Sequence, residues 1–423
     1  MWTQRDRIQA YQFLRRRLVS AVVSADANHP VPPARRLVLG TAIGAAVALL
    51  VAAVFGIIGL LSPARAAEWR QAGQVIVEKE TGARLVLGED GVLHPAVNYA
   101  SARLFAGGDG TKTITVPAKT LNGVPRGDTV GIPGAPDSVP ARERLLAGPW
   151  TSCTHGSSDR PANVEPPAKV LLGQSVAGRA LEPGQGFLVR TKSGDRFLVT
   201  GGNRYRVVDG RAVTALGYGL ADPVLVAANW LNTIPAGPDL KVLSVPGNGR
   251  GGPAVAGRST TVGQLFRAGG EYYLVTVDGL AAITETEALL IGGRATEVTP
   301  AAIDRVQGRS DGGYPRRRPD AVPVGQGESI CLTGEQIVFA TGLPDAGVVV
   351  PGGAGAVATE QPGGTTYLIT DTGRKHPVAD EDAVKALGYG GVPRQPLPAA
   401  VLALFPGGAP LDTAQARRTI TLG

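Results

Sequence analysis

The sequence predicts an α+β protein with a single N-terminal transmembrane helix. An elongated extracytoplasmic domain follows, in which four hairpin-plus-helix repeats surround a β-rich central module. Three observations support this prediction: a 25-residue apolar run at residues 37–61, an internal repeat later in the chain, and β-rich segments between the repeats. The 59 glycines and 33 prolines among 423 residues favour many turns and short elements.

The 36 residues before the apolar run are expected to form a cytoplasmic, basic and amphipathic arm. Its apolar residues recur at the three- and four-residue spacing of one helix face: Ile8, Tyr11, Leu14, Leu18 and Val22. Such a helix binds anionic lipid or a cytoplasmic partner. The candidate contact residues are Tyr11, Leu14, Arg15, Arg16, Arg17 and Leu18. The prolines in residues 29–33 should break any helix before the apolar run.

Residues 37–61 are predicted to cross a membrane. The run from Leu37 to Leu61 has no charged residue and no proline, and it exceeds the about 20 residues that span a bilayer core. Gly40 and Gly44 form a small-xxx-small pair that would let a second membrane helix approach closely. Chance is the alternative explanation of this pair, because glycine is common in membrane helices.

Arginines set the expected orientation. Residues 1–65 carry eight arginines and two acids, and seven of the eight arginines precede the apolar run. The positive-inside bias therefore places the N-terminus in the cytoplasm and residues 66–423 outside. The rest of the chain carries 34 basic and 33 acidic residues, so it lacks the basic excess of a nucleic-acid-binding surface.

A cleaved signal peptide is the rival interpretation of the apolar run. Residues 64–66, Ala-Arg-Ala, resemble the A-x-A pattern of a cleavage site. A signal peptide has an apolar stretch of about 7–15 residues behind a short basic start, whereas here 36 residues precede 25 apolar ones. These lengths favour an uncleaved anchor.

The internal repeat is clearest between residues 196–219 and residues 366–390. Both segments contain alternating strand residues, a turn with glycine and asparagine or aspartate, and the sequence Ala-Leu-Gly-Tyr-Gly. Residues 273–288 form a shorter copy, and residues 85–96 form another. An acidic cluster at residues 380–382 is expected to cap the helix that follows the last hairpin.

Segments with β-rich composition between the repeats are expected to form the central module. They are residues 113–116, 168–172, 241–245 and 336–339. Residues 247–252 and 308–323 look like loops or linkers.

The chain has two cysteines, Cys153 and Cys331, and both lie in inter-repeat segments. A disulfide between them is expected in an oxidising compartment. It would close a loop of 178 residues, which stabilises a fold by about 4–5 kcal/mol in the chain-entropy model. The alternative is a metal or catalytic thiol site at Cys153 with His155, for which the sequence offers no further ligands.

The predicted division of the chain has nine segments. They are the arm (1–36), the transmembrane helix (37–61), repeat 1 (62–110), a central segment with Cys153 (111–195), repeat 2 (196–237), a second central segment (238–270), repeat 3 (271–305), a linker and central segment with Cys331 (306–365), and repeat 4 with the C-terminal tail (366–423).

No catalytic motif is recognisable. Residues 107–113 resemble a phosphate loop only superficially, because Thr111 separates the last glycine from Lys112 and a strand-like stretch follows. The chain has no G-x-S-x-G elbow and no H-E-x-x-H. His94 and His376 occupy matching repeat positions before proline, which favours a structural role over catalysis. We therefore predict no catalytic, cofactor-binding or metal-binding residue.

Several segments together resemble one known family. They are residues 7–18 (RIQAYQFLRRRL), the single span, residues 94–104 (HPAVNYASARL), residues 150–153 (WTSC), and the order of repeats around a central module. On these grounds the chain resembles EccB, a membrane component of actinobacterial type VII (ESX) secretion systems, over essentially its full length.

This resemblance implies a structural membrane subunit that anchors a type VII protein secretion complex and extends into the periplasm. It implies hetero-oligomeric assembly in the inner membrane with EccC-, EccD- and EccE-like subunits, with the arm on cytoplasmic partners. The family's repeats resemble a phage-lysin cell-wall-binding fold, so peptidoglycan is a further candidate partner by analogy. ATPase activity has been attributed to the family, although the residues show no nucleotide site. Three classes stay open: a structural secretion subunit, a wall-binding module, and a membrane-anchored ATPase or hydrolase.

Overall fold

The computed structural model describes residues 3–25, 34–61, 68–109, 112–155, 164–310, 312–343 and 347–420. At residues 23–24, 34–37 and 58–61 it describes the backbone alone. The helix break predicted at residues 29–33 and the cleavage-site pattern at residues 64–66 lie outside these ranges. The chain forms two compact units, residues 1–71 with 116–122 and residues 72–115 with 123–423.

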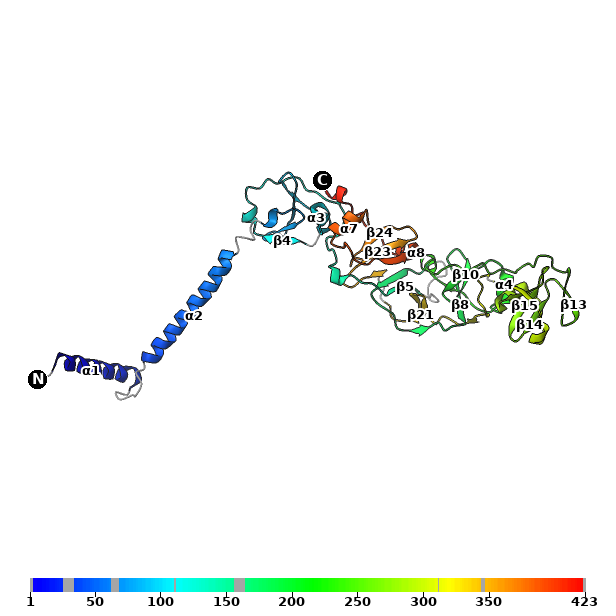
Figure 1. The fold of residues 1–423 in the computed structure, drawn as a ribbon, viewed down its shortest axis with the longest axis horizontal. Coiled ribbons are helices and arrows are strands. Elements are labelled where there is room, and N and C mark those ends of the chain that lie inside the picture. The colour runs from blue at the N-terminus through cyan, green and yellow to red at the C-terminus, as the bar shows by residue number, and fades with distance from the viewer. Residues whose placement is uncertain are drawn as a thin grey trace. The chain divides into compact units, whose positions relative to one another are not determined.

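The first unit contains two long helices (Figure 1). α1 (Gln4–Ser24) begins at Thr3, whose backbone N–H and hydroxyl donate to the Asp6 carboxylate at 3.0 and 2.6 Å. α2 (Ala34–Leu61) contains the segment Val38–Ile57, which is long and apolar enough to cross a membrane and has no buried part. The predicted span is therefore present as one candidate membrane helix. A short 3-10 turn, η2 (Ala118–Leu121), also belongs to this unit.

The second unit contains four repeats of one topology. Three antiparallel strands form a meander, a helix follows, and the next strand returns to pair with the first. Repeat 1 consists of β1 (Val75–Glu78), β2 (Arg84–Leu87), β3 (Leu93–Pro95), α3 (Tyr99–Ala106) and β4 (Thr113–Val116). Repeat 2 consists of β8 (Gln185–Arg190), β9 (Arg196–Thr200), β10 (Asn203–Val207), α4 (Gly210–Ala215), β11 (Val224–Leu225) and α5 (Ala228–Leu231).

Repeats 3 and 4 add short elements at their ends. Repeat 3 consists of β14 (Leu265–Ala268), β15 (Glu271–Val275), β16 (Leu280–Ile283), α6 (Glu285–Ile291), β17 (Thr296–Glu297), η4 (Pro300–Ala302) and β18 (Val306–Arg309). Repeat 4 consists of β23 (Ala356–Gln361), β24 (Thr366–Ile369), β25 (Lys375–Val378), α7 (Glu381–Ala386), β26 (Gln395–Pro398), α8 (Ala399–Leu402) and α9 (Thr413–Ala416).

The hairpin recognised in the sequence supplies the second and third strands of each meander. It is β9–β10 in repeat 2 and β24–β25 in repeat 4. The helix that directly follows each meander begins after a polar N-cap residue whose side chain accepts a backbone N–H: Asn98 for α3, Asp209 for α4, Thr284 for α6 and Asp380 for α7. The cap expected in the acidic cluster is thus Asp380. The residue limits of the nine segments remain a prediction.

The central module is a six-stranded sheet in the order β22-β6-β5-β20-β21-β7. Its strands are β5 (Trp150–His155), β6 (Ala168–Leu172), β7 (Arg179–Ala180), β20 (Ser329–Thr333), β21 (Gln336–Ala340) and β22 (Val348–Val349). Residues 168–172 and 336–339 lie in this sheet as predicted. β5 and β20 are adjacent and antiparallel, with Cys153 directly opposite Cys331.

Two segments predicted for the central sheet lie elsewhere. Residues 113–116 form β4 at the edge of the repeat 1 sheet, because strand composition does not specify which sheet a strand joins. Residues 241–245 form no strand, and the Leu243 N–H donates to the Leu290 carbonyl at 3.0 Å.

Both stretches predicted as loops contain strand residues. Residues 247–252 run into β12 (Gly251–Val255), which pairs with β13 (Arg258–Thr261). Within residues 308–323, β18 ends and β19 (Asp320–Ala321) pairs with β8. A short 3-10 turn, η3 (Arg142–Arg144), follows repeat 1.

The repeats of the second unit pair in a nested order. Repeat 1 packs on repeat 4 through a core that includes Leu104, Leu387 and Leu411. Repeat 2 packs on repeat 3 through a core that includes Leu216 and Leu290. Figure 1 shows α3 beside α7, and α4 close to the strands of repeat 3. Within the second unit, the chain thus runs through repeats 1 and 2 to one end and returns through repeats 3 and 4.

Both pairs of repeats contain an equivalent tyrosine contact. The Tyr389 hydroxyl of repeat 4 donates to the carbonyl of Pro140, which follows repeat 1 in the sequence, at 2.7 Å. The Tyr218 hydroxyl of repeat 2 donates to the carbonyl of Pro319, which follows repeat 3. Burial raises the pKa of both hydroxyls, that of Tyr218 to about 12. Both hydroxyls therefore stay protonated as donors at neutral pH.

The second unit consequently has two similar halves. The first half runs through repeat 1, β5, β6 and repeat 2, and the second runs through repeat 3, β20, β21 and repeat 4. Because β5 and β20 pair antiparallel with the cysteines opposite each other, an approximate twofold axis passes through the cysteine pair. Positions in one half can therefore be compared with equivalent positions in the other.

Candidate functional site

The arm residues singled out in the sequence lie on one continuous helix. Tyr11, Leu14 and Leu18 are 70%, 60% and 63% exposed, and Arg15, Arg16 and Arg17 are exposed as well. Three consecutive residues are spread over about 200° of a helix, so the arginines do not all border the apolar face. Large apolar side chains left in water are typical of a surface that another molecule covers.

Sequence periodicity missed Phe13, which is 61% exposed on α1. The Arg17 guanidinium lies 5.6 Å from the centre of its ring. Phe13 falls outside the three- and four-residue spacing, so only its size and position among arginines could have indicated it. It joins the candidate contact residues of the arm.

Gly40 and Gly44 lie on α2 with open space beside them. A methyl group built on either residue would meet no described atom within 4 Å. The glycines therefore present a bare strip of helix backbone on which a second helix could pack closely. Their role in helix contact remains a prediction.

Cys153 and Cys331 lie within bonding distance, with their sulfur atoms 2.11 Å apart. Both are fully buried between β5 and β20. Two residues along the same strand pair, His155 Nδ1 lies 3.0 Å from Ser329 Oγ. Ser329 is 2% exposed, so a substrate cannot reach this pair, and the contact is a cross-strand hydrogen bond and not a catalytic dyad.

His94 and His376 make the same structural contact in repeats 1 and 4. His94 Nδ1 lies 3.1 Å from the Asp128 carbonyl oxygen, and His376 Nδ1 lies 3.0 Å from the Ala409 carbonyl oxygen. Burial lowers the pKa of His376. These contacts agree with a structural role, which stays a prediction for both histidines.

The glycine-rich segment at residues 107–113 does not form a phosphate loop in its described part, which excludes residues 110 and 111. The Lys112 carbonyl accepts the Val75 N–H at 3.0 Å, and β4 begins at Thr113. A phosphate loop needs a helix at this point. Among the described residues, no group of three or more His, Cys, Asp or Glu side chains could hold a metal ion.

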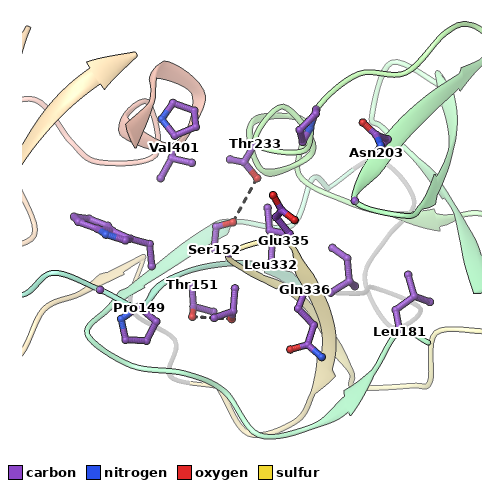
Figure 2. A pocket seen from close by; sticks show the side chains of 18 of the residues that line it. Pro149, Thr151, Ser152, Leu181, Asn203, Thr233, Leu332, Glu335, Gln336 and Val401 are labelled. Atoms are coloured by element: carbon purple, nitrogen blue, oxygen red, sulfur yellow. Dashed lines mark hydrogen bonds between the residues drawn. The ribbon is translucent and has the colours of Figure 1, made fainter. Parts of the chain in front are cut away.

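A large cleft lies where repeats 2 and 4 meet the central sheet (Figure 2). Its volume is about 1090 Å³. Ser152 and Leu332 belong to the sheet, Thr233 to repeat 2, and Val401 to repeat 4. Ser152 Oγ and Thr233 Oγ1 lie 3.4 Å apart, and both residues are buried. The residues that line the cleft, as far as the structure describes them, include no Lys, Arg or His.

Comparison with known families decides the identity of the fold. The model of the family described as "Type VII secretion system ESX-1, transport TM domain B", EccB, matches residues 1–340 and 335–421. The chain belongs to the EccB family. EccB proteins are membrane components of type VII secretion complexes, so the predicted family and its secretion role are both confirmed.

Curated EccB relatives match either nearly the whole chain or about half of it. The "ESX-3 secretion system ATPase EccB3" of Mycobacterium tuberculosis is 27% identical over 97% of this chain and 88% of its own length. The "ESX-2 secretion system ATPase EccB2" of the same species is 32% identical over 55% of this chain and 48% of its own.

Solved structures share the fold. An EccB3 dimer from the ESX-3 core complex matches with a TM-score of 0.66 and 24% identity, over 82% of this chain and all of the other. A chain of an intact ESX-5 inner membrane complex matches with a TM-score of 0.64 and 24% identity, over 100% of this chain and 96% of the other.

Proposed function

We propose that this EccB-family chain is a structural anchor of its secretion complex, with α1 in the cytoplasm, α2 in the inner membrane and the repeats in the periplasm. The observation that carries the proposal is the exposed apolar face of α1 beside its arginines. An apolar helix face of this size gains free energy when it is covered, and no described part of the chain buries it.

The partners that we propose are EccC-, EccD- and EccE-like subunits. Affinity purification of the intact chain from detergent-solubilised membranes should recover them, and identification by mass spectrometry tests this directly. A chain that lacks residues 1–30 but retains a membrane-insertion signal should recover fewer of them. If this shorter chain assembled and supported secretion normally, the arm would not be a docking element.

The orientation rests on the excess of arginines before α2. A reporter enzyme that is active only outside the cytoplasm should work when fused after Gly423 and fail when fused before Met1. The opposite pattern would overturn the periplasmic assignment.

The chain's own contribution is structural and not the hydrolysis of ATP, although its relatives carry the word ATPase in their names. The large cleft presents the carboxylates of Glu182 and Glu335. A triphosphate would be repelled by these groups and would find no Lys or Arg among the described lining residues. Purified full-length chain should therefore release no phosphate from Mg-ATP above the level of a mock purification. Turnover proportional to the amount of chain would contradict this assignment.

A further inference from the structure

The cleft between repeats 2 and 4 lies where the side chains at equivalent positions of the two halves differ in size. Trp230 is the third residue of α5 (Ala228–Leu231), and Val401 is the third residue of α8 (Ala399–Leu402). Trp230 is fully buried, and its indole N–H donates to the Ser152 carbonyl at 3.0 Å. Val401 instead lines the open cleft.

The same difference recurs on the central sheet. The residue before each cysteine is Ile330 in the second half and Ser152 in the first, and their cross-strand neighbours are Phe339 and Val170. Phe339 packs edge-on against Phe187 with ring centres 5.2 Å apart. Ser152 and Val170 line the cleft. Large residues therefore fill the interface of repeat 2 with the sheet at these positions. At the equivalent positions the interface of repeat 4 has smaller residues that border the cleft, beside a core that includes Leu172, Leu402 and Phe405.

The open interface is shaped for a bulky apolar group. Leu332, Ile337 and Leu397 add apolar walls to the small side chains of Val170 and Val401. The Trp150 ring also lines the cleft, and its Nε1 atom is buried without an acceptor among the described residues.

The rim is acidic. Glu182 and Glu335 are exposed at the cleft, and the amides of Asn203 and Gln336 add polar groups. Figure 2 shows Glu335 and Gln336 on the β20–β21 hairpin and Asn203 across the cleft from Val401. This arrangement favours a ligand with positive charge next to an apolar group, and it disfavours anions.

We propose that this cleft binds an extended peptide segment of another protein. A bulky apolar side chain of the peptide enters between Val401 and Ser152, and a flanking lysine or arginine reaches Glu182 or Glu335. The peptide thereby supplies in the second half the large side chain that Trp230 supplies in the first.

The test uses full-length chain in detergent and a fluorescein-labelled pentapeptide, glycine-lysine-tryptophan-lysine-glycine. Fluorescence anisotropy should show saturable binding to the chain. The same peptide with glutamates in place of the lysines should bind at least about tenfold more weakly, because it loses two charged contacts. Equal binding of the two peptides would contradict the acidic rim.

Val401→Trp should fill the cleft and weaken binding by about tenfold or more, since it repeats the packing of Trp230. Ala403→Trp is the matched control, because Ala403 is exposed just after α8 and does not line the cleft. It should bind the peptide like the unmodified chain. Unchanged binding by Val401→Trp would overturn the proposal.

Exposed rim residues allow a test that does not disturb packing. Glu182→Gln with Glu335→Gln should weaken the lysine peptide by about tenfold, whereas Glu143→Gln, an exposed carboxylate outside the cleft, should not. If the lysine peptide did not bind, and an uncharged oligosaccharide such as chitotetraose bound the unmodified chain but not Val401→Trp, the cleft would be a saccharide site and the peptide proposal would be wrong.

Discussion

The large apolar side chains of α1 are exposed, whereas those in the cores of the repeats are buried. On α1, Tyr11, Leu14 and Leu18 are each more than half exposed, while Trp230 and Leu387 in the repeats are fully buried. The repeats complete their own cores, whereas α1 leaves an apolar face for another molecule. The comparison teaches that the residues that fold the chain and those expected to assemble the complex lie in different parts of the sequence.

The largest effect on folding is expected at Trp230. Trp230→Ala removes the largest buried side chain of the interface between repeat 2 and the sheet, together with its hydrogen bond to Ser152. The free energy of unfolding should fall by about 3–5 kcal/mol, measured by denaturant titration of the full chain in detergent. Val401→Ala at the equivalent position in the second half should cost about 1 kcal/mol or less, because Val401 borders an open cleft. Equal losses would contradict the difference between the halves.

The second effect concerns Cys153 and Cys331, which join the two halves on the approximate twofold axis. Replacing both by alanine should lower the free energy of unfolding by about 2–5 kcal/mol, because the unfolded chain regains a loop of 178 residues. Thiol labelling of the unmodified chain should detect no free thiol until denaturant and reductant are both present. Two freely reacting thiols in the native chain would refute the disulfide and the compartment argument built on it.

A smaller effect is expected from His376. Burial holds its pKa below the ordinary value of 6.5, so the unfolded chain binds a proton more readily than the folded chain. The contribution of His376 is therefore fully present above pH 6.5 and is lost as the pH falls below it. His376→Asn should reduce the loss of thermal stability between pH 7 and pH 5.

An unchanged loss of thermal stability between pH 7 and pH 5 in His376→Asn would contradict this prediction. The hydrogen bond of His376 to the Ala409 carbonyl oxygen cannot cause such a loss, because a carbonyl acceptor favours the protonated imidazole and so raises the pKa.

Local sequence patterns predicted the elements that local chemistry specifies. The apolar run predicted α2, the acidic cluster predicted the cap at Asp380, and the repeated hairpins predicted β9–β10 and β24–β25. Each of these depends on residues close together in the chain, such as a turn glycine or an N-cap carboxylate. The family resemblance added the secretion role, which no single motif carries.

Features that depend on distant residues could not be predicted in this way. The first strand of each repeat pairs with the recognisable hairpin, but the four first strands share no sequence motif. Residues 113–116 and 241–245 have similar composition, yet one joins the repeat 1 sheet and the other forms no strand. The cleft lies where Trp230 of the first half is matched by Val401 of the second. This equivalence can be recognised only once the twofold relation between the halves is known.

The smallest effect on folding, and the clearest test of the comparison, is expected in the arm. Arg15, Arg16 and Arg17 are exposed on α1, so reversing all three to glutamate should leave the unfolding of the repeats unchanged. Assembly should nevertheless be lost, because reversal adds repulsion from the acids or lipid phosphates that the arginines would contact. Lysine replacements should cause a milder defect, since lysine keeps the charge but lacks the planar guanidinium.

Replacing Tyr11 and Leu14 by aspartate should be at least as damaging to assembly, because an apolar face that is more than half exposed must be covered by a partner or by lipid. The measurement is recovery of partner subunits in affinity purification, with the denaturant titration of the same samples as the control. If either set of arm variants shifted the unfolding of the repeats while partner recovery stayed normal, the division between folding and assembly residues would be wrong.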